Sequence, residues 1–266
     1  MPDIDDKILD ELLEFADGLA NAAQMVITTH FRRDLAIDHK ASDMPRGQPV
    51  TEADRATEKA IRGMIAAHYP AHGIVGEELG TTNPGADWQW LIDPIDGTRA
   101  FIAGIPLFGT LIGLTHHGAP VLGVIEQPVL GERFVGSARG ATFNGHPMMV
   151  RACASLDDAV FATTDPAMFA APAARAAYET VRRRANVTQL GGNCYSYAML
   201  AIGAVDLVIE ADLKPWDVAA LVPVVEAAGG VITAWDGGPA IEASEIIACG
   251  DRALHGEVQA LLAGAV

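Results

Sequence analysis

The hydrophobic pattern of the chain changes its period twice, and this limits the possible folds more than any other feature. Apolar residues recur at helical spacing over residues 8–27 and 51–69. From Gly73 the pattern shortens to strand-length apolar runs separated by glycine-containing turns. From about Val150, strand and helix patterns alternate. This irregular order argues against a regular βαβ barrel and predicts one folding unit of mixed α and β character.

We expect the chain to form one domain with two halves. Its 266 residues, half of them hydrophobic, are enough for one large core. The composition changes in the middle of the chain without a flexible linker. The prediction is therefore a single domain over residues 1–266, with an α+β half at about 1–148 and an α/β half at 149–266. In the second half, residues 216–228 predict one helix that Gly229-Gly230 would end.

The charge of the chain is strongly acidic. With 18 basic and 34 acidic residues, the formal net charge is −16. Such a surface repels phosphate backbones and anionic lipid, so we expect no nucleic-acid partner and no membrane partner. If the ligand is an anion, a metal ion is the obvious agent to neutralise the local field, although the excess of acid also suits mere solubility. No apolar run is long enough for a membrane span, no signal-peptide pattern is present and no CxxC pair occurs, so we expect a cytoplasmic protein with free thiols.

Two carboxylates follow an apolar run in the middle of the first half. Asp93 comes at the end of the predicted strand, and Asp96 lies three residues later on the same side of the turn. Carboxylates this close repel unless a proton or cation lies between them, and oxygen ligands select hard cations such as magnesium. A helix beginning at Gly97-Thr98 would add an anion site beside the metal, which in outline is a phosphate-ester hydrolysis site. The alternative is that Asp96 only caps a helix and Asp93 only ends a strand.

Three separated motifs together resemble the inositol monophosphatase superfamily, which contains magnesium-dependent, lithium-sensitive phosphomonoesterases. The motifs are Gly76-Glu77-Glu78, the run from Trp90 to Thr98, and the run from Trp216 to Ala220, and they stand in the family's order. The resemblance extends from Val50 to Gly230. It implies an α+β fold arranged as a layered α/β/α/β/α sandwich, a metal-binding first half, and a homodimer.

The resemblance also implies the metal ligands. Glu77, Asp93 and the backbone carbonyl of Ile95 match the ligands of a first Mg²⁺. Asp93, Asp96 and Asp217 match those of a second. Glu77 would also reach a third, weaker site, so the expected cofactor is two to three Mg²⁺ ions per active site.

The expected catalytic residues are Thr98, Asp54 and Glu77. Asp54 and Thr98 match the pair that orients the attacking water. The Thr98 hydroxyl is no base, but it can accept a hydrogen bond from a metal-bound water while it donates one to Asp54. Because metal binding lowers the pKa of the water, no strong base is needed, and no covalent intermediate is implied.

The implied substrate contacts lie in both halves. They are Gly97, Thr98, Gly191, Gly192, Asn193, Glu210 and Asp217. The stretches 191–197 and 208–217 look like the histidinol-phosphatase branch of the superfamily. That branch usually has Asp where this chain has Asn193, which offers only a neutral carbonyl to a substrate ammonium group. The polar loop over residues 38–49 also contains an unusual insertion-like segment, residues 42–46.

We therefore expect a Mg²⁺-dependent phosphatase that hydrolyses L-histidinol phosphate to L-histidinol and phosphate, a step of histidine biosynthesis. The alternative within the superfamily is an inositol-1-phosphate phosphatase or a broad sugar-phosphate phosphatase. In each case the partner is a small-molecule phosphate monoester. A third possibility is a non-catalytic member that binds a metabolite or a partner through the same fold. We expect the basic run Arg182–Arg184 and the pair His116-His117 to be exposed to solvent.

Overall fold

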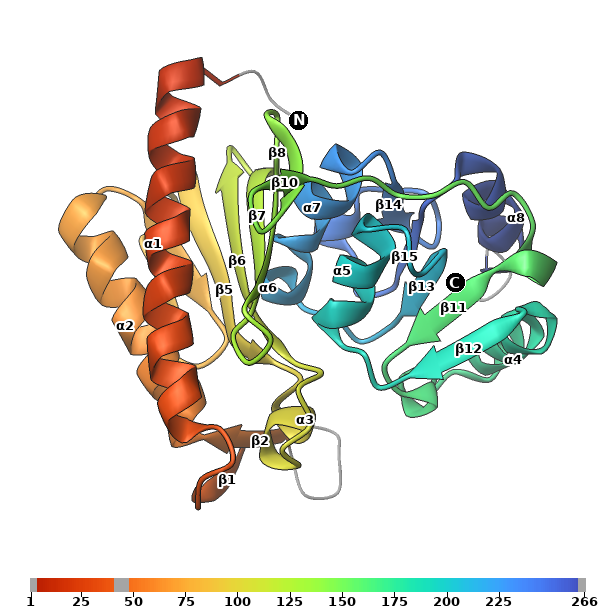
Figure 1. Ribbon diagram of the computed structural model, residues 1–266, viewed down its shortest axis with the longest axis horizontal. Coiled ribbons are helices and arrows are strands. Elements are labelled where there is room, and N and C mark those ends of the chain that lie inside the picture. The colour runs from red at the N-terminus through yellow and green to blue at the C-terminus, as the bar shows by residue number, and fades with distance from the viewer. Residues whose placement is uncertain (1–3, 41–47, 263–266) are drawn as a thin grey trace.

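The computed structural model describes residues 4–40 and 48–262, and Figure 1 shows five layers of helices and sheets. Helices α1 (Asp6–His30) and α2 (Glu52–His68) form the first layer, followed by the larger sheet. A middle helical layer separates that sheet from a smaller one, and further helices cover the far side. The predicted α+β class and the layered α/β/α/β/α sandwich are confirmed.

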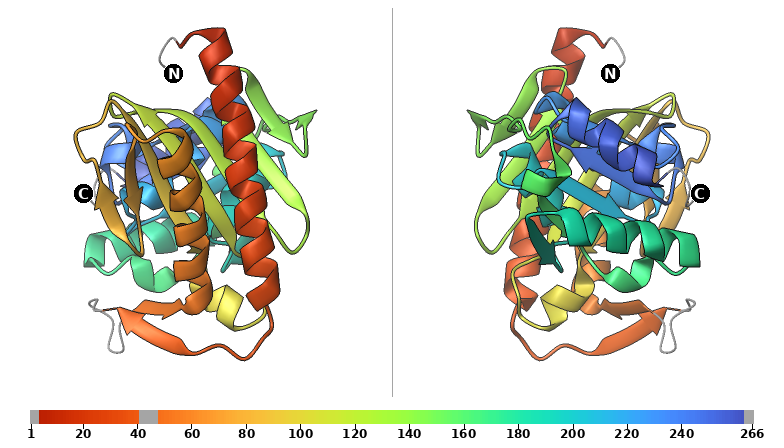
Figure 2. Two further views of the ribbon diagram at one scale, coloured as in Figure 1. Left: turned by 90° about the vertical axis from the view of Figure 1, so that its left-hand side faces the viewer. Right: turned by 90° about the vertical axis from the view of Figure 1, so that its right-hand side faces the viewer.

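Side-chain hydrogen bonds cap the start of each of the first two helices. The Asp5 carboxylate caps α1 by accepting from the amides of Lys7 and Ile8. Thr51 and Asp54 form a capping box at the start of α2. Both helices bury one apolar stripe, and they lie side by side over one face of the larger sheet (Figure 2, left).

A strand pair replaces part of the expected polar loop. Strand β1 (Ile37–Lys40) pairs antiparallel with β2 (Gln48–Thr51), with Lys40 opposite Gln48. Strand β1 is largely exposed and so carries little apolar signal, whereas β2 buries Val50 and Thr51 at its end. The insertion-like segment at residues 42–46 lies outside the described residues.

The larger sheet has eight strands in the order β10-β9-β8-β7-β6-β5-β3-β4. All neighbouring pairs are antiparallel except β3 and β5, which are parallel. The strands are β3 (Gly73–Gly76), β4 (Gly80–Thr82), β5 (Trp88–Asp96), β6 (Gly109–His116), β7 (Ala119–Gln127), β8 (Glu132–Ser137), β9 (Gly140–Phe143) and β10 (His146–Pro147). A short helix, α3 (Thr98–Ile102), follows β5 directly.

The smaller sheet has five strands in the order β12-β11-β13-β15-β14. Strand β11 is parallel to β12 and β13, whereas β15 is antiparallel to its two neighbours. The elements of this half are η1 (Leu156–Asp158), β11 (Val160–Thr163), η2 (Pro166–Met168), α4 (Pro172–Arg184), β12 (Val187–Leu190), α5 (Cys194–Ala201), β13 (Leu207–Glu210), α6 (Pro215–Val218), α7 (Leu221–Ala227), β14 (Val231–Ala234), η3 (Ala240–Glu242), β15 (Ile246–Cys249) and α8 (Arg252–Leu262). Helices α4 and α8 lie over its outer face (Figure 2, right).

The single helix expected over residues 216–228 is wrong: the structure has two short helices, α6 and α7, with a break at Ala219-Ala220. Pro223 has no N–H to donate to the Ala219 carbonyl, so a continuous helix would leave that carbonyl unpaired and crowd it against the proline ring. The predicted end of this segment at Gly229 is correct, since α7 stops just before it with Gly229 at a φ of 92°.

The expected exposure is confirmed for Arg182, Arg183 and His117, but Arg184 and His116 are half-buried. Arg184, at the end of α4, pairs with Asp157 and Glu257. His117 is exposed, whereas the half-buried His116 stacks on Trp88 with ring centroids 4.0 Å apart. In the described part of the chain, no helix is long and apolar enough to cross a membrane.

Candidate active site

Residues from the segments 40–99 and 164–217 line one cavity of about 410 Å³. All five predicted metal ligands line it: Glu77, Asp93, Ile95, Asp96 and Asp217. The predicted substrate contacts Gly97, Thr98, Asn193 and Glu210 also line it. A second cavity, of about 420 Å³, includes none of these residues and contains the paired charges of Arg133, Glu126 and Asp17.

The end of β5 delivers the two central carboxylates. Pairing between β5 and β6 shifts register between Asp93 and Asp96, so the strand is irregular where these side chains reach the cavity. Asp93 is only 3 % exposed, and its carboxylate accepts from the Ile95 amide at 2.9 Å. Gly97 then takes a φ of 91°, and α3 begins at Thr98. The expected strand, turn and helix start are therefore present, with a helix of five residues.

Burial and mutual repulsion act on these acids together. Burial raises the pKa of Asp93 well above its usual value, and the charges of Glu77, Asp96 and Asp217 raise it further. Burial also raises the pKa values of Asp96 and Asp217. The amide of Cys194, at the start of α5, donates to Asp96 and partly offsets this effect. The cavity thus concentrates negative charge in a desolvated place, where a cation would stabilise the charged forms.

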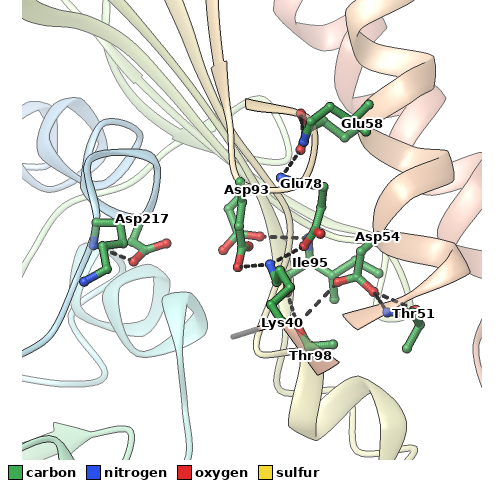
Figure 3. Close-up of polar contacts among 12 residues, drawn as sticks. Lys40, Thr51, Asp54, Glu58, Glu78, Asp93, Ile95, Thr98 and Asp217 are labelled. Carbon is green, nitrogen blue, oxygen red and sulfur yellow. Dashed lines mark hydrogen bonds and ion pairs between the residues drawn. The ribbon is translucent and has the colours of Figure 1, made fainter. Parts of the chain in front are cut away.

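A lysine that the sequence analysis did not single out partly neutralises the negative charge of the cavity. Lys40 Nζ lies 2.7 Å from a carboxylate oxygen of Glu77 and 2.7 Å from one of Glu78. Figure 3 shows Lys40 beside Glu78. Burial raises the pKa of Glu78 to about 7, and the Lys40 ammonium opposes that shift. No sequence signal marked Lys40, because its contact depends on the β1–β2 pairing.

The donor set suits Mg²⁺ in its chemistry. The predicted ligands offer only carboxylate and carbonyl oxygens, which hard cations prefer. Among residues 4–40 and 48–262, no three His, Cys, Asp or Glu side chains are grouped closely enough to hold an ion. The raised pKa values of three of the carboxylates point to a site that a cation would complete. The assignment of individual ligands stays a prediction.

The expected water-orienting pair is close together. Asp54 is 1 % exposed and accepts from the Thr51 amide at 2.8 Å and the Thr51 hydroxyl at 2.6 Å (Figure 3). Thr98 Oγ1 lies 3.3 Å from Asp54 Oδ1 and 3.1 Å from the Ile95 carbonyl oxygen. The capping box therefore holds Asp54 still, and the Thr98 hydroxyl keeps a lone pair for a water in the cavity.

The loop before α5 connects the two halves of the molecule. Asn193 has a φ of 48°, and its Nδ2 donates to the Leu107 carbonyl at 2.7 Å, while its amide donates to Thr164 Oγ1 at 3.1 Å. Gly191 and Gly192 do not line the cavity, but a side chain at Gly192 would overlap Ser196 Oγ. These glycines shape the loop. The side-chain carboxamide of Asn193 donates to the Leu107 carbonyl.

Glu210 stands at the end of β13, 3 % exposed. Its carboxylate accepts from both the amide of Thr164, at 2.9 Å, and the Thr164 hydroxyl. Burial raises the pKa of Glu210 to about 8, and the Thr164 donors oppose the shift. The sequence analysis missed Thr164, although it follows a predicted strand whose parallel neighbour ends in Glu210, so both end at the same sheet edge.

Two charged pairs also line the cavity. Arg99 Nη1 of α3 lies 3.2 Å from a carboxylate oxygen of Asp165, which stands just before η2 in the other half. Lys214 Nζ lies 3.0 Å from Asp212. All four residues line the cavity. The wall of the cavity therefore carries both positive and negative side chains, an arrangement that composition alone could not reveal.

The layered α+β fold and the acidic, oxygen-rich cavity at the strand ends suit a phosphatase that uses a metal ion. The chain belongs to the inositol monophosphatase family, whose model matches residues 8–266.

Known proteins of this family resemble the chain over nearly its full length. A bifunctional phosphatase, IMPL2, of Arabidopsis thaliana is 43% identical over 265 residues, covering 95% of this chain and 75% of that protein. A histidinol-phosphatase of Chlorobaculum parvum is 38% identical over 220 residues, covering 82% and 83%. Among solved structures, an inositol monophosphatase from Zymomonas mobilis has a TM-score of 0.85 at 41% identity, covering 96% of this chain and 98% of that one.

Proposed function

We propose that the protein hydrolyses L-histidinol phosphate to L-histidinol and phosphate, as a step of histidine biosynthesis. The observation that carries this proposal is the place of Glu210, a buried carboxyl group on the cavity wall. Burial disfavours an unpaired negative charge there and so raises the pKa of Glu210. A substrate ammonium group would stabilise its charged form. The relative from Chlorobaculum parvum, itself named a histidinol-phosphatase, supports the same choice.

In the proposed mechanism, the carboxylates of Glu77, Asp93, Asp96 and Asp217 and the Ile95 carbonyl would hold two to three Mg²⁺ ions. When bound, they supply charge stabilisation at the phosphate and lower the pKa of the attacking water.

The other steps belong to side chains of this chain. Asp54, held by Thr51, accepts from the Thr98 hydroxyl. Thr98 in turn accepts from the attacking water and aims a lone pair of that water at phosphorus. We propose that the Gly97-Thr98 backbone binds a phosphate oxygen and that Glu210 binds the ammonium end of the alcohol.

One observation favours a second candidate, an inositol-1-phosphate phosphatase or a broader sugar-phosphate phosphatase. Asn193 is neutral, and its Nδ2 is already bound to the Leu107 carbonyl. An uncharged side chain here adds no attraction for an ammonium group and does not disfavour a polyol. The solved structure from Zymomonas mobilis is titled an inositol monophosphatase.

Rates on histidinol phosphate, inositol 1-phosphate and fructose 1,6-bisphosphate, measured side by side with and without Mg²⁺, test the proposal. A site built to pair a buried ammonium group should reject a neutral polyol by roughly 10²–10⁴-fold in kcat/KM. Faster hydrolysis of inositol 1-phosphate would reverse the choice of substrate and leave the metal chemistry standing. If none of the three substrates releases phosphate in a Mg²⁺-dependent way, the result would favour the alternative of a non-catalytic protein.

We also propose, from the family resemblance, that the protein is a lithium-sensitive homodimer of the cytoplasm. Light scattering after size-exclusion chromatography tests the dimer, and inhibition of phosphate release by LiCl tests the sensitivity.

A further inference from the structure

The turn that carries Glu77 is a tight hairpin loop. Strand β3 ends at Gly76 and β4 begins at Gly80, which takes a φ of 73°, as a short loop of this kind requires. The Glu77 amide donates to the Ile92 carbonyl at 3.2 Å, so the loop is attached to β5 one residue before Asp93. The conformation of this loop therefore decides where the Glu77 carboxylate can reach.

A buried carboxylate from another element occupies the inside of this loop. Glu58 of α2 is fully buried, at 0 % exposed. It accepts from the amide of Glu78 at 2.7 Å and from that of Leu79 at 3.1 Å (Figure 3 shows the bond to Glu78). Amide groups of a tight turn that converge on one anion form a strong, directional contact in a site without water.

The contact is tight, and a second side chain supports it. A side chain at Gly76 would overlap the Glu58 carboxylate, so only glycine permits this approach. Arg62, one turn further along α2, donates to Glu58 at 2.6 Å and also to the Gly80 carbonyl and to Thr82 Oγ1. Helix α2 thus holds the loop from Glu78 to the start of β4.

The same helix also carries Asp54, four residues before Glu58 and on the same face. We propose that Glu58 is a positioning residue, which fixes Glu77 relative to the Asp54–Thr98 pair and thereby sets the metal affinity of the Glu77 site. This inference rests on the proposed role of Glu77 as a metal ligand. A purely structural role for Glu58, as a core ion pair with Arg62, would affect stability without selective loss of metal binding.

Glu58→Gln tests the proposal with a matched control. The control is Glu126→Gln, because Glu126 is also buried, at 2 % exposed, and paired with an arginine, Arg133, but does not line the cavity. Metal-free protein is titrated with Mn²⁺, and the free ion is followed by electron paramagnetic resonance. We expect Glu58→Gln to weaken Mn²⁺ binding by about 10–100-fold, as for other groups that orient a metal ligand, and Glu126→Gln to leave it unchanged.

Activity gives the second readout. The Mg²⁺ concentration for half-maximal rate should rise in Glu58→Gln by the same factor, while kcat at saturating Mg²⁺ recovers to within a few-fold. Mn²⁺ binding equal to that of the control overturns the proposal. Because binding is measured without substrate, a wrong choice of substrate does not affect this result, whereas failure of the unmodified protein to bind Mn²⁺ would refute the metal site itself.

Two further variants keep the test decisive if Glu58→Gln does not fold. Glu58→Asp keeps the charge but is too short to reach both loop amides, so it should also weaken Mn²⁺ binding. Arg62→Gln leaves the bonds from Glu58 to the Glu78 and Leu79 amides in place, although it removes the donors of Arg62 to Gly80 and Thr82, and should shift binding by less than about threefold, a small part of the range above. If Arg62→Gln loses as much affinity as Glu58→Asp, the contacts of Arg62 and not those of Glu58 with the loop amides position the loop, and the proposal fails.

Discussion

Asp93 is the residue on which most of the proposed chemistry depends. It is 3 % exposed at the end of β5, and its pKa is raised by burial and by the charges of Glu77, Asp96 and Asp217. In the proposed site it serves both the first and the second ion, whereas Glu77 serves the first ion and a weaker third one. Its carboxylate accepts from the nearby Ile95 amide, a contact that the side-chain oxygen of an asparagine can keep.

We predict that Asp93→Asn removes most activity and leaves the protein folded. The loss should be about 10³-fold in kcat or more, because the charge that holds two ions is removed. Steady-state rates on histidinol phosphate measure the loss, and circular dichroism checks the fold. Near-normal turnover in a folded variant would contradict the two-metal scheme.

Thr98 and Asp54 should act as one unit. Thr98→Ala is expected to lower kcat more than it raises KM, because orientation of the water matters chiefly in the transition state. Asp54→Asn should affect the same step through the contact between Thr98 Oγ1 and Asp54 Oδ1 at 3.3 Å. In a double-mutant cycle the combined loss should be much smaller than the sum of the separate losses. Additive losses would show that the two side chains act independently.

The Glu210 side chain should determine the choice of substrate. Glu210→Gln removes the charge but keeps the size and one acceptor for the Thr164 donors. We expect kcat/KM for histidinol phosphate to fall much more than kcat/KM for a simple alkyl phosphate, which has no ammonium group. An equal fall for both substrates would assign Glu210 to structure and not to recognition.

At the scale of elements, a row of glycines positions the segment that carries Asp217. Gly113, Gly123 and Gly136 stand opposite one another on β6, β7 and β8. Side chains at the last two would overlap the backbone of Ala220 and Pro223, where α6 and α7 meet the sheet. The two short helices therefore pack with their backbone directly on the strands, and Asp217 is held close to the end of β5.

We predict that Gly123→Ala destabilises the protein and weakens the site. The new methyl group would meet the Ala220 carbonyl, which is backbone and cannot swing away, so the free energy of unfolding should fall by at least about 1–3 kcal/mol. Urea unfolding measures this change, and the Mg²⁺ requirement of the reaction should rise as Asp217 moves. The control is Gly63→Ala on α2, where the added methyl meets nothing within 4 Å and should be neutral or stabilising. Equal effects of the two substitutions would refute the packing argument.

At the scale of the whole molecule, negative charge dominates. The net charge is −16, and several of the acids lie in one cavity with Lys40 as a partial counterion. We propose that the halves at about 1–148 and 149–266 meet at this cavity and share its charge. Binding of a cation there should then stabilise the folded chain as well as prepare it for catalysis.

We predict that Mg²⁺ raises the Tm and that EDTA reverses the change. A ligand that binds only the folded state at 100 times its Kd adds about 2.7 kcal/mol to the free energy of unfolding. Differential scanning calorimetry at constant ionic strength measures the shift, with NaCl-matched samples as the control for simple screening. A Tm that follows ionic strength alone would mean that no specific ion binds. In Asp93→Asn the shift should be largely lost.

Local features of the sequence were enough to predict much of this protein. The helical period of the apolar residues predicted α1 and α2, and the apolar run before Asp93 predicted β5. The order of three motifs indicated the family. Most of the predicted site residues line one cavity, and they lie at or near the end of a strand or the start of a helix, which are places that short-range patterns reveal.

Tertiary structure decided what depends on residues far apart in the chain. The pairing of β1 with β2 places Lys40 on Glu77, and the glycines of the larger sheet admit the broken helix pair α6–α7. The contact of Asn193 with Leu107 and that of Glu58 with the Glu78 amide likewise join separate elements. Hydrophobic period and turn residues encode backbone conformation over a few residues, whereas these contacts exist only once the sheets and helices have packed, so no local pattern could indicate them.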